Sequence, residues 1–155
     1  MDMLSKTAFL GVELLKKDCP EICNYKDNEI ALLFANNNSS AQTDIKFQET
    51  YKDGGIPSPS LFVYTLPNIP MGDIAIRNKW YGENMFTVAE SFDAEYFSNY
   101  CNILLNKNAE SALCGWLDVN DNKIEAFFFF VTKKDLKQLN LQFGLKQLSE
   151  IFESN

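Results

Sequence analysis

The sequence contains no histidine and only one arginine, Arg77. Without histidine, Ser-His-Asp and Cys-His catalysis, imidazole ligation of metals and the usual general base near neutral pH are all excluded. Lysine and arginine together number 14 against 21 acidic residues, so the formal net charge is −7. Nucleic acid is therefore not an expected partner, because neutralising phosphates calls for a basic face and arginine is the favoured reader of base edges.

Glycine and proline are also scarce, at 7 and 5 of the 155 residues. With 46% hydrophobic and 23% charged residues, the composition is that of a globular chain and not of a disordered or fibrous one. A domain of this size buries about 68–70% of its unfolded surface, so it needs neither disulfides nor a structural metal. We expect one domain spanning residues 1–155.

The beginning of the chain has no long apolar run. Charges at Asp2, Lys6 and Glu13 interrupt residues 1–15, a pattern that predicts neither a signal peptide nor a membrane span. We therefore expect a cytoplasmic location, where thiols stay reduced.

Cysteine is the remaining soft metal ligand. The first two cysteines have a C-x3-C spacing, but there is no second close pair and no histidine to complete a zinc set. We expect structural thiols, no metal and no cofactor. The four cysteines are Cys19, Cys23, Cys101 and Cys114.

Hydrophobic periodicity predicts an α/β domain with a mixed sheet and helices on its faces. The Asn120-Asp121-Asn122-Lys123 stretch predicts a hairpin turn. Residues 56–70 hold four of the five prolines and predict an ordered loop without helix. The expected helices are 5–17, 43–51, 71–80, one beginning at 91, and 141–153; the expected strands are 29–35, 85–89, 112–119 and 124–131.

Two segments leave alternatives open. The four consecutive phenylalanines, residues 127–130, have apolar side chains on both faces of a strand, which is typical either of a central strand covered by helices or of an interface. Residues 139–143 alternate like a strand, whereas 141–152 also fit helical spacing, and we predict helix for 141–153.

Four further side chains have expected roles in structure. Arg77 is expected to face solvent or to form a salt bridge. Trp80 and Tyr81 are expected to pack in the domain. Asn68 is expected to satisfy backbone groups of its proline-rich loop.

The proline-rich segment carries a resemblance. Residues 57–76 read PSPSLFVYTLPNIPMGDIAI, and Gly82-Glu83-Asn84 follow. This resembles the β-ketoacyl synthase (ketosynthase) family of the thiolase-like fold, in which SP-x-LF…LPN-x-P-x-G-x-I-A-I precedes a GPN turn. The matched motif positions are Pro59, Phe62, Pro67, Asn68, Gly72 and Gly82. The resemblance covers roughly residues 29–119 and implies one layered half of that fold, with a nucleophile strand, a buried helix and a further strand in order.

The resemblance also implies where a nucleophile would stand. Family enzymes place a cysteine at the elbow between the nucleophile strand and the buried helix, where the helix N-terminus stabilises a thiolate. Counted from Gly82, that position falls on Ser91, or on Glu90 if the elbow differs by one residue. The family's histidines have no counterpart either. A serine nucleophile would need Glu90, Asp93, a lysine or a tyrosinate as its base; the alternative, which we expect, is that Ser91 caps the helix, worth about 1 kcal/mol.

In the family, the strand after the turn pairs with its counterpart across a two-fold axis, and members without the cysteine persist as partners of active enzymes. The matching interface candidates are Met85, Phe86, Thr87 and Val88. We therefore expect a non-catalytic ketosynthase-like protein that forms a homodimer, or a heterodimer with an active condensing enzyme of a fatty-acid or polyketide pathway. One alternative is a module that binds acyl thioesters or acyl carrier protein, through a local lysine patch or apolar contact. Another is a residual acyltransferase or hydrolase that uses Ser91.

Overall fold

The computed structural model describes residues 1–120, 123–138 and 148–154. Their strands form a four-stranded mixed sheet in the order β2-β1-β3-β4. β1 runs parallel to both of its neighbours, and β4 is antiparallel to β3. The bounds are β1 (Ile30–Asn36), β2 (Asn84–Val88), β3 (Ser111–Val119) and β4 (Ile124–Thr132).

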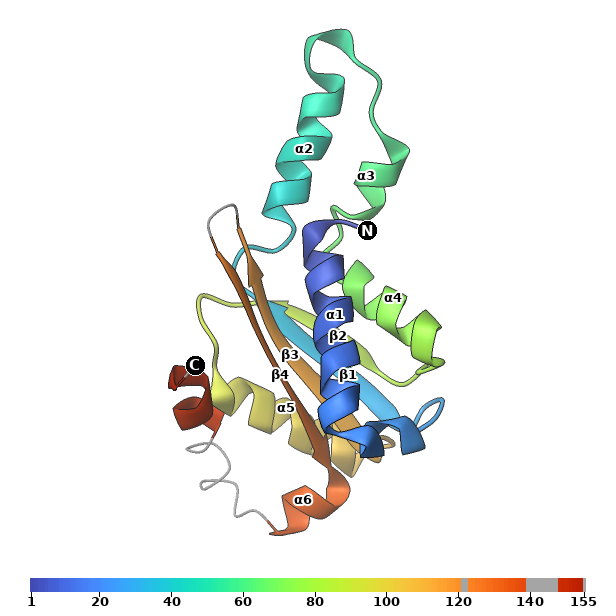
Figure 1. The fold of residues 1–155 in the computed structure, drawn as a ribbon, viewed down its shortest axis with the longest axis vertical. Helices are drawn as coiled ribbons and strands as arrows, with labels where there is room; N and C mark the ends of the chain where they lie inside the picture. Colours follow the sequence, from blue (N-terminus) through green and yellow to red (C-terminus); the bar gives the residue numbers. More distant parts are fainter. Residues whose placement is uncertain (121–122, 139–147, 155) are drawn as a thin grey trace.

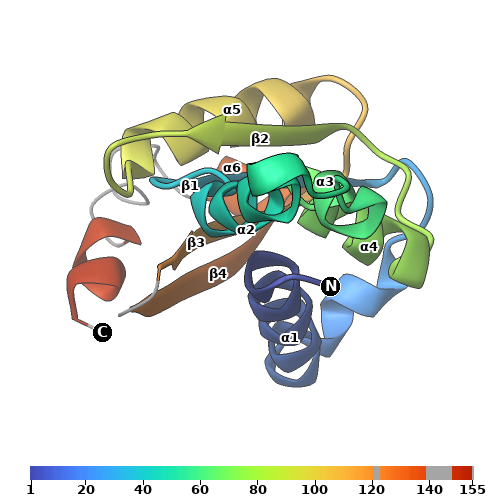
Figure 2. The same cartoon turned by 90° about the horizontal axis from the view of Figure 1, so that it is seen from above.

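Helices cover both faces of this sheet (Figures 1 and 2). α1 and α4 lie on one face, and α5 lies on the other. The layered α/β fold expected from the sequence is therefore the one observed. The helices are α1 (Met3–Asp18), α2 (Ala41–Tyr51), α3 (Pro59–Val63), α4 (Ile69–Asn78), α5 (Ala94–Asn106) and α6 (Lys133–Gln138), with 3₁₀ turns η1 (Pro20–Asn24) and η2 (Lys52–Gly54).

Alternation along the central strands divides the core in two. In β1, Leu32 and Phe34 face α1 and α4, whereas Ala31 and Leu33 face α5. All seven residues of β1 are buried. A strand buried on both faces needs a continuous apolar run, which is why the sequence of β1 lacks the polar alternation of a surface strand.

The phenylalanine run follows the same division, with Phe127 and Phe129 on the α5 side and Phe128 and Phe130 on the α1 side. Of the two alternatives that the sequence left open, the central strand is excluded, because β4 is an edge strand of the described sheet and its phenylalanines are half-buried. The continuous run arises because helices cover both faces even at this edge.

The prediction of a loop without helix over residues 56–70 was also wrong. Pro59 stands in the first turn of α3, and Pro70 stands in the first turn of α4. Proline is tolerated there because first-turn amides have no partner within the helix. The Ser58 side chain completes the α3 terminus by accepting a hydrogen bond from the Leu61 amide.

At the C-terminus, the sequence did not predict α6. The predicted helix 141–153 is only partly testable: residues 148–153 are helical, and 141–147 lie outside the described residues.

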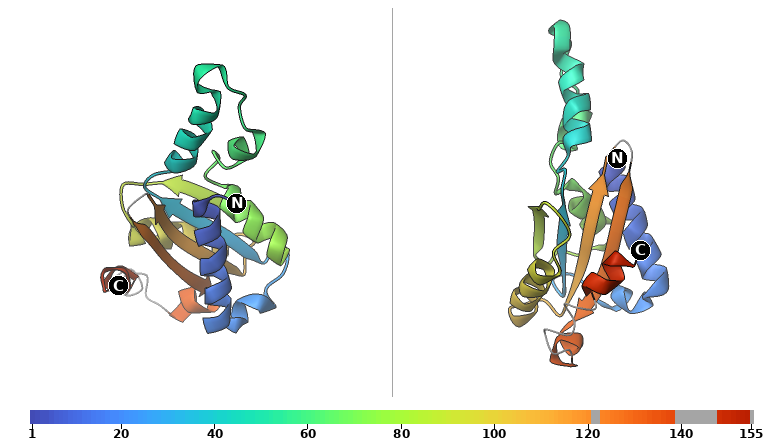
Figure 3. Two further views of the ribbon diagram at one scale, coloured as in Figure 1. Left: turned by 45° about the horizontal axis from the view of Figure 1, so that its top comes forward. Right: turned by 90° about the vertical axis from the view of Figure 1, so that its left-hand side faces the viewer.

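A two-helix arm, defined here as residues 41–66 and built from α2, η2 and α3, projects beyond the carboxyl ends of the strands (Figures 1 and 3). Two contacts hold its base. Ser40 Oγ donates to the Thr65 carbonyl at 2.5 Å, and Thr43 Oγ1 donates to Asp2 Oδ2 at 2.8 Å. From Asp44 to Ile69 no residue is buried. The arm therefore has no hydrophobic core of its own.

Candidate functional site

The predicted elbow lies at the carboxyl ends of the parallel strands. From β1 the chain leaves toward the face that carries α4, and from the neighbouring β2 it leaves toward α5. In open α/β sheets, ligands bind where adjacent strands send their connections to opposite faces. Glu90 and Ser91 stand at this point, and the Asn37 side chain donates to the Glu90 carbonyl at 2.6 Å.

Ser91 does not cap α5, which corrects the sequence prediction. Asp93 is the N-cap, and its carboxylate accepts hydrogen bonds from the amides of Glu95 and Tyr96. The ring of Phe92 stacks on that of Phe97 at 5.4 Å between centroids. A hydrophobic pair that spans the residue before the cap and the fourth helical residue fixes the start of a helix, and only Asp93 as cap gives this pair.

Ser91 is exposed and, among the described residues, forms no hydrogen bond. A serine nucleophile requires a base within hydrogen-bonding reach. The Asp93 carboxylate is already engaged with the helix amides. The described residues thus bring Glu90 and Ser91 to the expected edge of the sheet without assembling a charge-relay arrangement around them.

The interface candidates lie on the other edge strand. Within the described part of the chain, β2 pairs with β1 alone, in a register that places Phe86 opposite Phe34. Met85 packs on the α5 side and Phe86 on the α1 side, while Val88 is 53% exposed. The Thr87 hydroxyl shares a short hydrogen bond with the Tyr96 hydroxyl of α5. Side chains thus hold the strand on both faces of the sheet, whereas strand pairing within the described residues holds it along one edge.

The hydrogen-bonding pattern of β2 shows which groups face outward. At its two ends, the Glu83 carbonyl and the Ala89 amide bond to β1. Because residues of a parallel strand alternate in the neighbour they address, the backbone groups of Phe86 and Val88 point away from β1. Such an edge is a template for another strand.

The arm carries a second uncovered surface. Its six exposed large apolar side chains include Ile56 at 88% and Phe62 at 56% exposure. Phe47 contacts Phe62 across the two helices at 5.5 Å between ring centroids, but it is itself only half-buried. Several exposed large apolar side chains on one projecting segment are typical of a contact site. The six side chains are Ile45, Tyr51, Ile56, Phe62, Val63 and Leu66.

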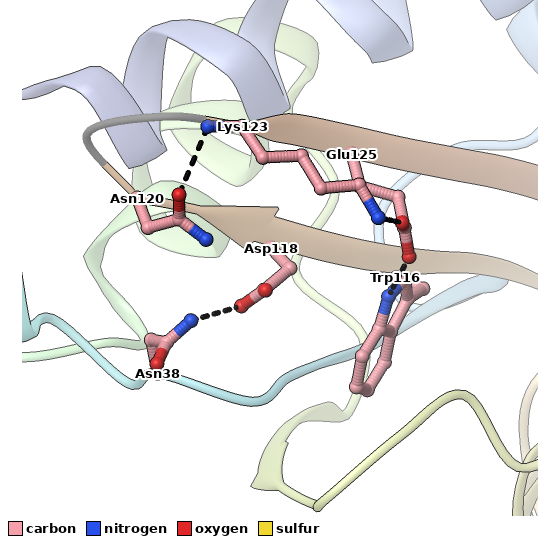
Figure 4. Close-up of polar contacts among 6 residues, drawn as sticks. All are labelled: Asn38, Trp116, Asp118, Asn120, Lys123 and Glu125. Atoms are coloured by element: carbon pink, nitrogen blue, oxygen red, sulfur yellow. Dashed lines mark hydrogen bonds and ion pairs between the residues drawn. The ribbon is translucent and has the colours of Figure 1, made fainter.

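A polar cluster that sequence analysis missed joins the strand ends beside the base of the arm (Figure 4). Asn38, after β1, donates to Asp118 Oδ1 of β3 at 2.8 Å. The Trp116 indole donates to Glu125 Oε1 of β4 at 2.9 Å, and the Lys123 ammonium forms a short ion pair with the other oxygen of Glu125.

The cluster orders the strand ends. The hydrogen bond from Lys123 is the main reason why the pKa of Glu125 lies below its ordinary value, and the Trp116 indole lowers it further. Both carboxylates of the cluster, Asp118 and Glu125, already accept hydrogen bonds from named donors. Polar residues at the ends of three strands were the available signal, but the contact that joins β1 to β3, from Asn38 to Asp118, spans 80 positions of sequence.

The motif residues serve different structural roles. Pro59 and Phe62 lie in α3, while Pro67 and Asn68 precede α4, which contains Gly72. The matched motif residues therefore lie in the arm and in the segment that leads from the arm into α4. They do not gather around Ser91.

The sixth motif residue, Gly82, precedes β2. A Cβ there would collide with the Ile30 carbonyl oxygen and lie 2.9 Å from its carbon. Only glycine permits this close approach of β2 to β1.

Two of the single-residue expectations were wrong. Tyr81 is 59% exposed and does not pack in the domain. The Asn68 side chain makes no hydrogen bond within the described residues, and its carbonyl instead accepts from Met71. By contrast, Trp80 is buried as expected, and Arg77 faces solvent.

The cysteines divide into two pairs. Cys101 of α5 and Cys114 of β3 are buried with their sulfur atoms 3.3 Å apart, so Cys101 belongs to the core as expected. Burial is the first cause that raises the pKa of Cys114, which keeps it a protonated thiol. In the described ranges, no three side chains of metal-binding type converge.

The comparisons add no assignment: no family model matches the sequence, and no curated protein matches it either. Of the helices in the described ranges, none has the length and apolar character needed to traverse a bilayer.

Proposed function

We propose that the protein is a non-catalytic, ketosynthase-like association module. It joins either a second copy of itself or an active condensing enzyme of a fatty-acid or polyketide-type pathway. The observation that carries the proposal is the edge strand β2, which has no charged residue, lies directly before the degenerate elbow Glu90-Ser91 and, among the described residues, pairs with one strand only.

The order of the elements supports the family part of the proposal. The resemblance implies a nucleophile strand, a buried helix and a further strand, and the chain follows β2 with α5 and then β3. Cys101, Leu104 and Leu105 are among the α5 side chains buried against the sheet. The position that would hold the nucleophile is an exposed serine with no base hydrogen-bonded to it in the described ranges, which argues against a catalytic role.

The arm supports association on energetic grounds. Burying one large apolar side chain contributes about 1.5–3 kcal/mol. The six exposed side chains of the arm, covered from their present partial exposure, would contribute roughly 5–10 kcal/mol. Because association costs about 4–15 kcal/mol, the arm alone is marginal, and strand pairing through β2 would make the complex stable.

The test replaces Val88 by proline. The Val88 amide points away from β1, so proline removes an outward donor and leaves the β1 pairing intact, as it does in natural edge strands. Val88→Thr keeps the amide and the branched side chain, and it is the matched control. We expect wild type and Val88→Thr to be dimeric at micromolar concentration by analytical ultracentrifugation, and Val88→Pro to be monomeric with an unchanged circular dichroism spectrum.

Association with a condensing enzyme, the heteromeric form of the proposal, predicts a different result. If wild type is monomeric, affinity purification from native cells should recover a condensing enzyme with wild type and with Val88→Thr but not with Val88→Pro. A monomeric wild type that recovers no such enzyme, or a dimer unaffected by Val88→Pro, contradicts the proposal.

A further inference from the structure

A cavity of about 290 Å³ opens at the amino ends of β1 and β2, the opposite end of the sheet from Glu90 and Ser91. It forms where the Asp27 carbonyl accepts from the Tyr81 amide and holds two chain segments together. Its volume is close to the lower limit of small-ligand pockets, roughly 300 Å³. The residues that line it are Lys16, Cys23, Tyr25, Lys26, Asp27, Asn78, Lys79 and Trp80.

Three lysines from three different segments line this cavity. Lys16 lies in the last turn of α1, Lys26 lies in the turn before β1, and Lys79 follows α4 with φ of 60°. Left-handed backbone is unfavourable for a residue with a side chain, and glycine is the usual residue at this position. The sequence nevertheless supplies a lysine there, in a chain of net charge −7.

The lysines differ in how they are held. The Lys16 ammonium donates to Glu13 at 2.9 Å and to Asn78 Oδ1 at 2.7 Å, which fixes its position and leaves one of its three N–H groups available. Lys26 and Lys79 form no ion pair with any carboxylate of the described ranges. Two unneutralised ammonium groups therefore stand beside a positioned one.

The remaining wall is aromatic and rigid. Trp80 is 3% exposed, and its indole donates to the Tyr25 carbonyl at 3.2 Å. A pocket with apolar walls and a few convergent polar groups is the usual form of a small-ligand site.

Three carboxylates stand next to the lysines: Asp27 lines the cavity, Glu13 bonds to Lys16, and Glu29 accepts a hydrogen bond from the Lys26 amide at 2.9 Å. The cavity as a whole therefore carries no excess of positive charge, and it is the two ammonium groups without an ion pair that favour an anion.

We propose that this cavity binds the phosphate group of a small phosphomonoester, with Lys16, Lys26 and Lys79 as its ligands. An ammonium is a point donor suited to phosphate oxygens. The volume admits a phosphate with a short organic group but not a nucleotide-sized ligand. This site is independent of the β2 edge, so it stands or falls separately from the proposed function.

The chain offers a built-in reporter. Of its two tryptophans, Trp80 lines the cavity and Trp116 lies at the other end of the sheet. In a Trp116→Phe background, Trp80 fluorescence is followed as glycerol 3-phosphate is added, with sodium chloride at matched ionic strength as the control. We expect a saturable change with the phosphomonoester and none with chloride.

Two double variants test the assignment of the lysines. Lys26→Gln with Lys79→Gln should weaken binding about tenfold or more, because each lost charge-assisted hydrogen bond is a strong one. Lys46→Gln with Lys52→Gln removes the same charge from the arm and should change the dissociation constant by less than about twofold, since exposed distant charges are screened.

A second readout uses Cys23, an exposed thiol that lines the cavity. In a Cys19→Ser background, Cys101 and Cys114 are buried, so Cys23 is the thiol open to a reagent such as Ellman's. Glycerol 3-phosphate should slow the reaction of Cys23 with the reagent when Lys26 and Lys79 are present. It should not slow that reaction in the Lys26→Gln, Lys79→Gln variant.

The proposal is overturned by any of three results. These are no saturation beyond the chloride control, equal weakening by both double variants, or loss of stability in the Lys26/Lys79 variant with an unchanged titration. The last result would assign these lysines to helix and turn stability alone.

Discussion

Replacing Gly11 by alanine tests how α1 lies on the sheet. A Cβ built on Gly11 would overlap the Phe128 ring of β4, with ring atom Cζ at 2.7 Å. The ring has little room to retreat, because a Cβ on Gly115 of β3 would lie 2.9 Å from its other side. Phe128 therefore fills the space between two glycines, one on the helix and one on the strand.

The change that Gly11→Ala makes to the free energy of unfolding follows from two opposing effects. Alanine is favoured over glycine inside a helix by about 1 kcal/mol. Carbon atoms need a separation of about 3.5–4.0 Å. The ring atom Cε2 would lie even closer to the added Cβ than Cζ does, so the ring or the helix must move by roughly 1.5–2 Å. Overpacking of this kind costs about 1–3 kcal/mol. We take the upper end of that range because the ring is enclosed on both sides. The expected net loss is about 2 kcal/mol, or roughly 4–8 °C in Tm for a chain of this length.

Gly72→Ala is the matched control. Gly72 is also a helical glycine, in α4, but no atom lies within 4 Å of a Cβ built on it. It should therefore gain up to about 1 kcal/mol and roughly 2–4 °C. Thermal and urea unfolding, followed by far-UV circular dichroism, measures both variants.

A double variant locates the cause. In a Phe128→Ala background, Gly11→Ala no longer meets the ring and should be neutral or stabilising, so the two substitutions should couple by about 1–3 kcal/mol. If Gly11→Ala raises Tm as Gly72→Ala does, α1 does not cross β4 at this point, and the packing described here is wrong.

Two further predictions concern single carboxylates. Asp93→Ala should lower the free energy of unfolding by about 1 kcal/mol, because it removes the α5 cap, whereas Ser91→Ala should leave urea unfolding unchanged; the reverse order would restore Ser91 as the cap. Asp73 Oδ2 is buried without a hydrogen-bond partner in the described ranges, and burial is the main cause that raises the pKa of Asp73. A raised pKa means that its contribution to stability is complete below the unfolded value, about 3.9, and is lost as pH rises through the folded value. Asp73→Asn should thus be more stable than wild type at pH 7 in urea titrations, with the difference disappearing toward pH 4 or below; a constant difference across that range would exclude ionisation as the cause.

The strands of the fold were predictable because their signals are local. The apolar run of β1 and the two runs flanking the turn before Lys123 have the lengths of strands and end at polar residues. Each boundary of these three strands agrees with the prediction to within one residue. Periodicity and turn chemistry act over a few neighbours, so a single sequence contains them.

The predicted N-cap of α5 was wrong, and the structure shows why. Ser91 and Asp93 are both good caps by residue type. What decides between them is the aromatic pair Phe92 and Phe97, which spans the cap only when Asp93 occupies it. This signal is present in the sequence, and weighing side-chain pairs along with cap preference would have found it.

The cavity and the polar cluster could not be predicted from the spacing of residues along the sequence. Lys16, Lys26 and Lys79 come from two helix ends and a turn, and they meet only because α1 packs against α4. In the same way, Asn38 meets Asp118 across 80 positions of sequence. Such contacts depend on strand order, which a single sequence leaves undetermined.

The two edges of the described sheet differ in a way that bears on association. β4 carries Glu125 along its length, and Lys123 and Lys133 flank it. Charges on an edge strand oppose pairing with another chain. β2 is also flanked by charges, Glu83 and Glu90, but it has no charged residue from Asn84 to Val88. If neither edge bound a partner strand, this difference in charge between the two strands would have no role. The charge pattern therefore favours β2 as the edge at which a partner strand can add.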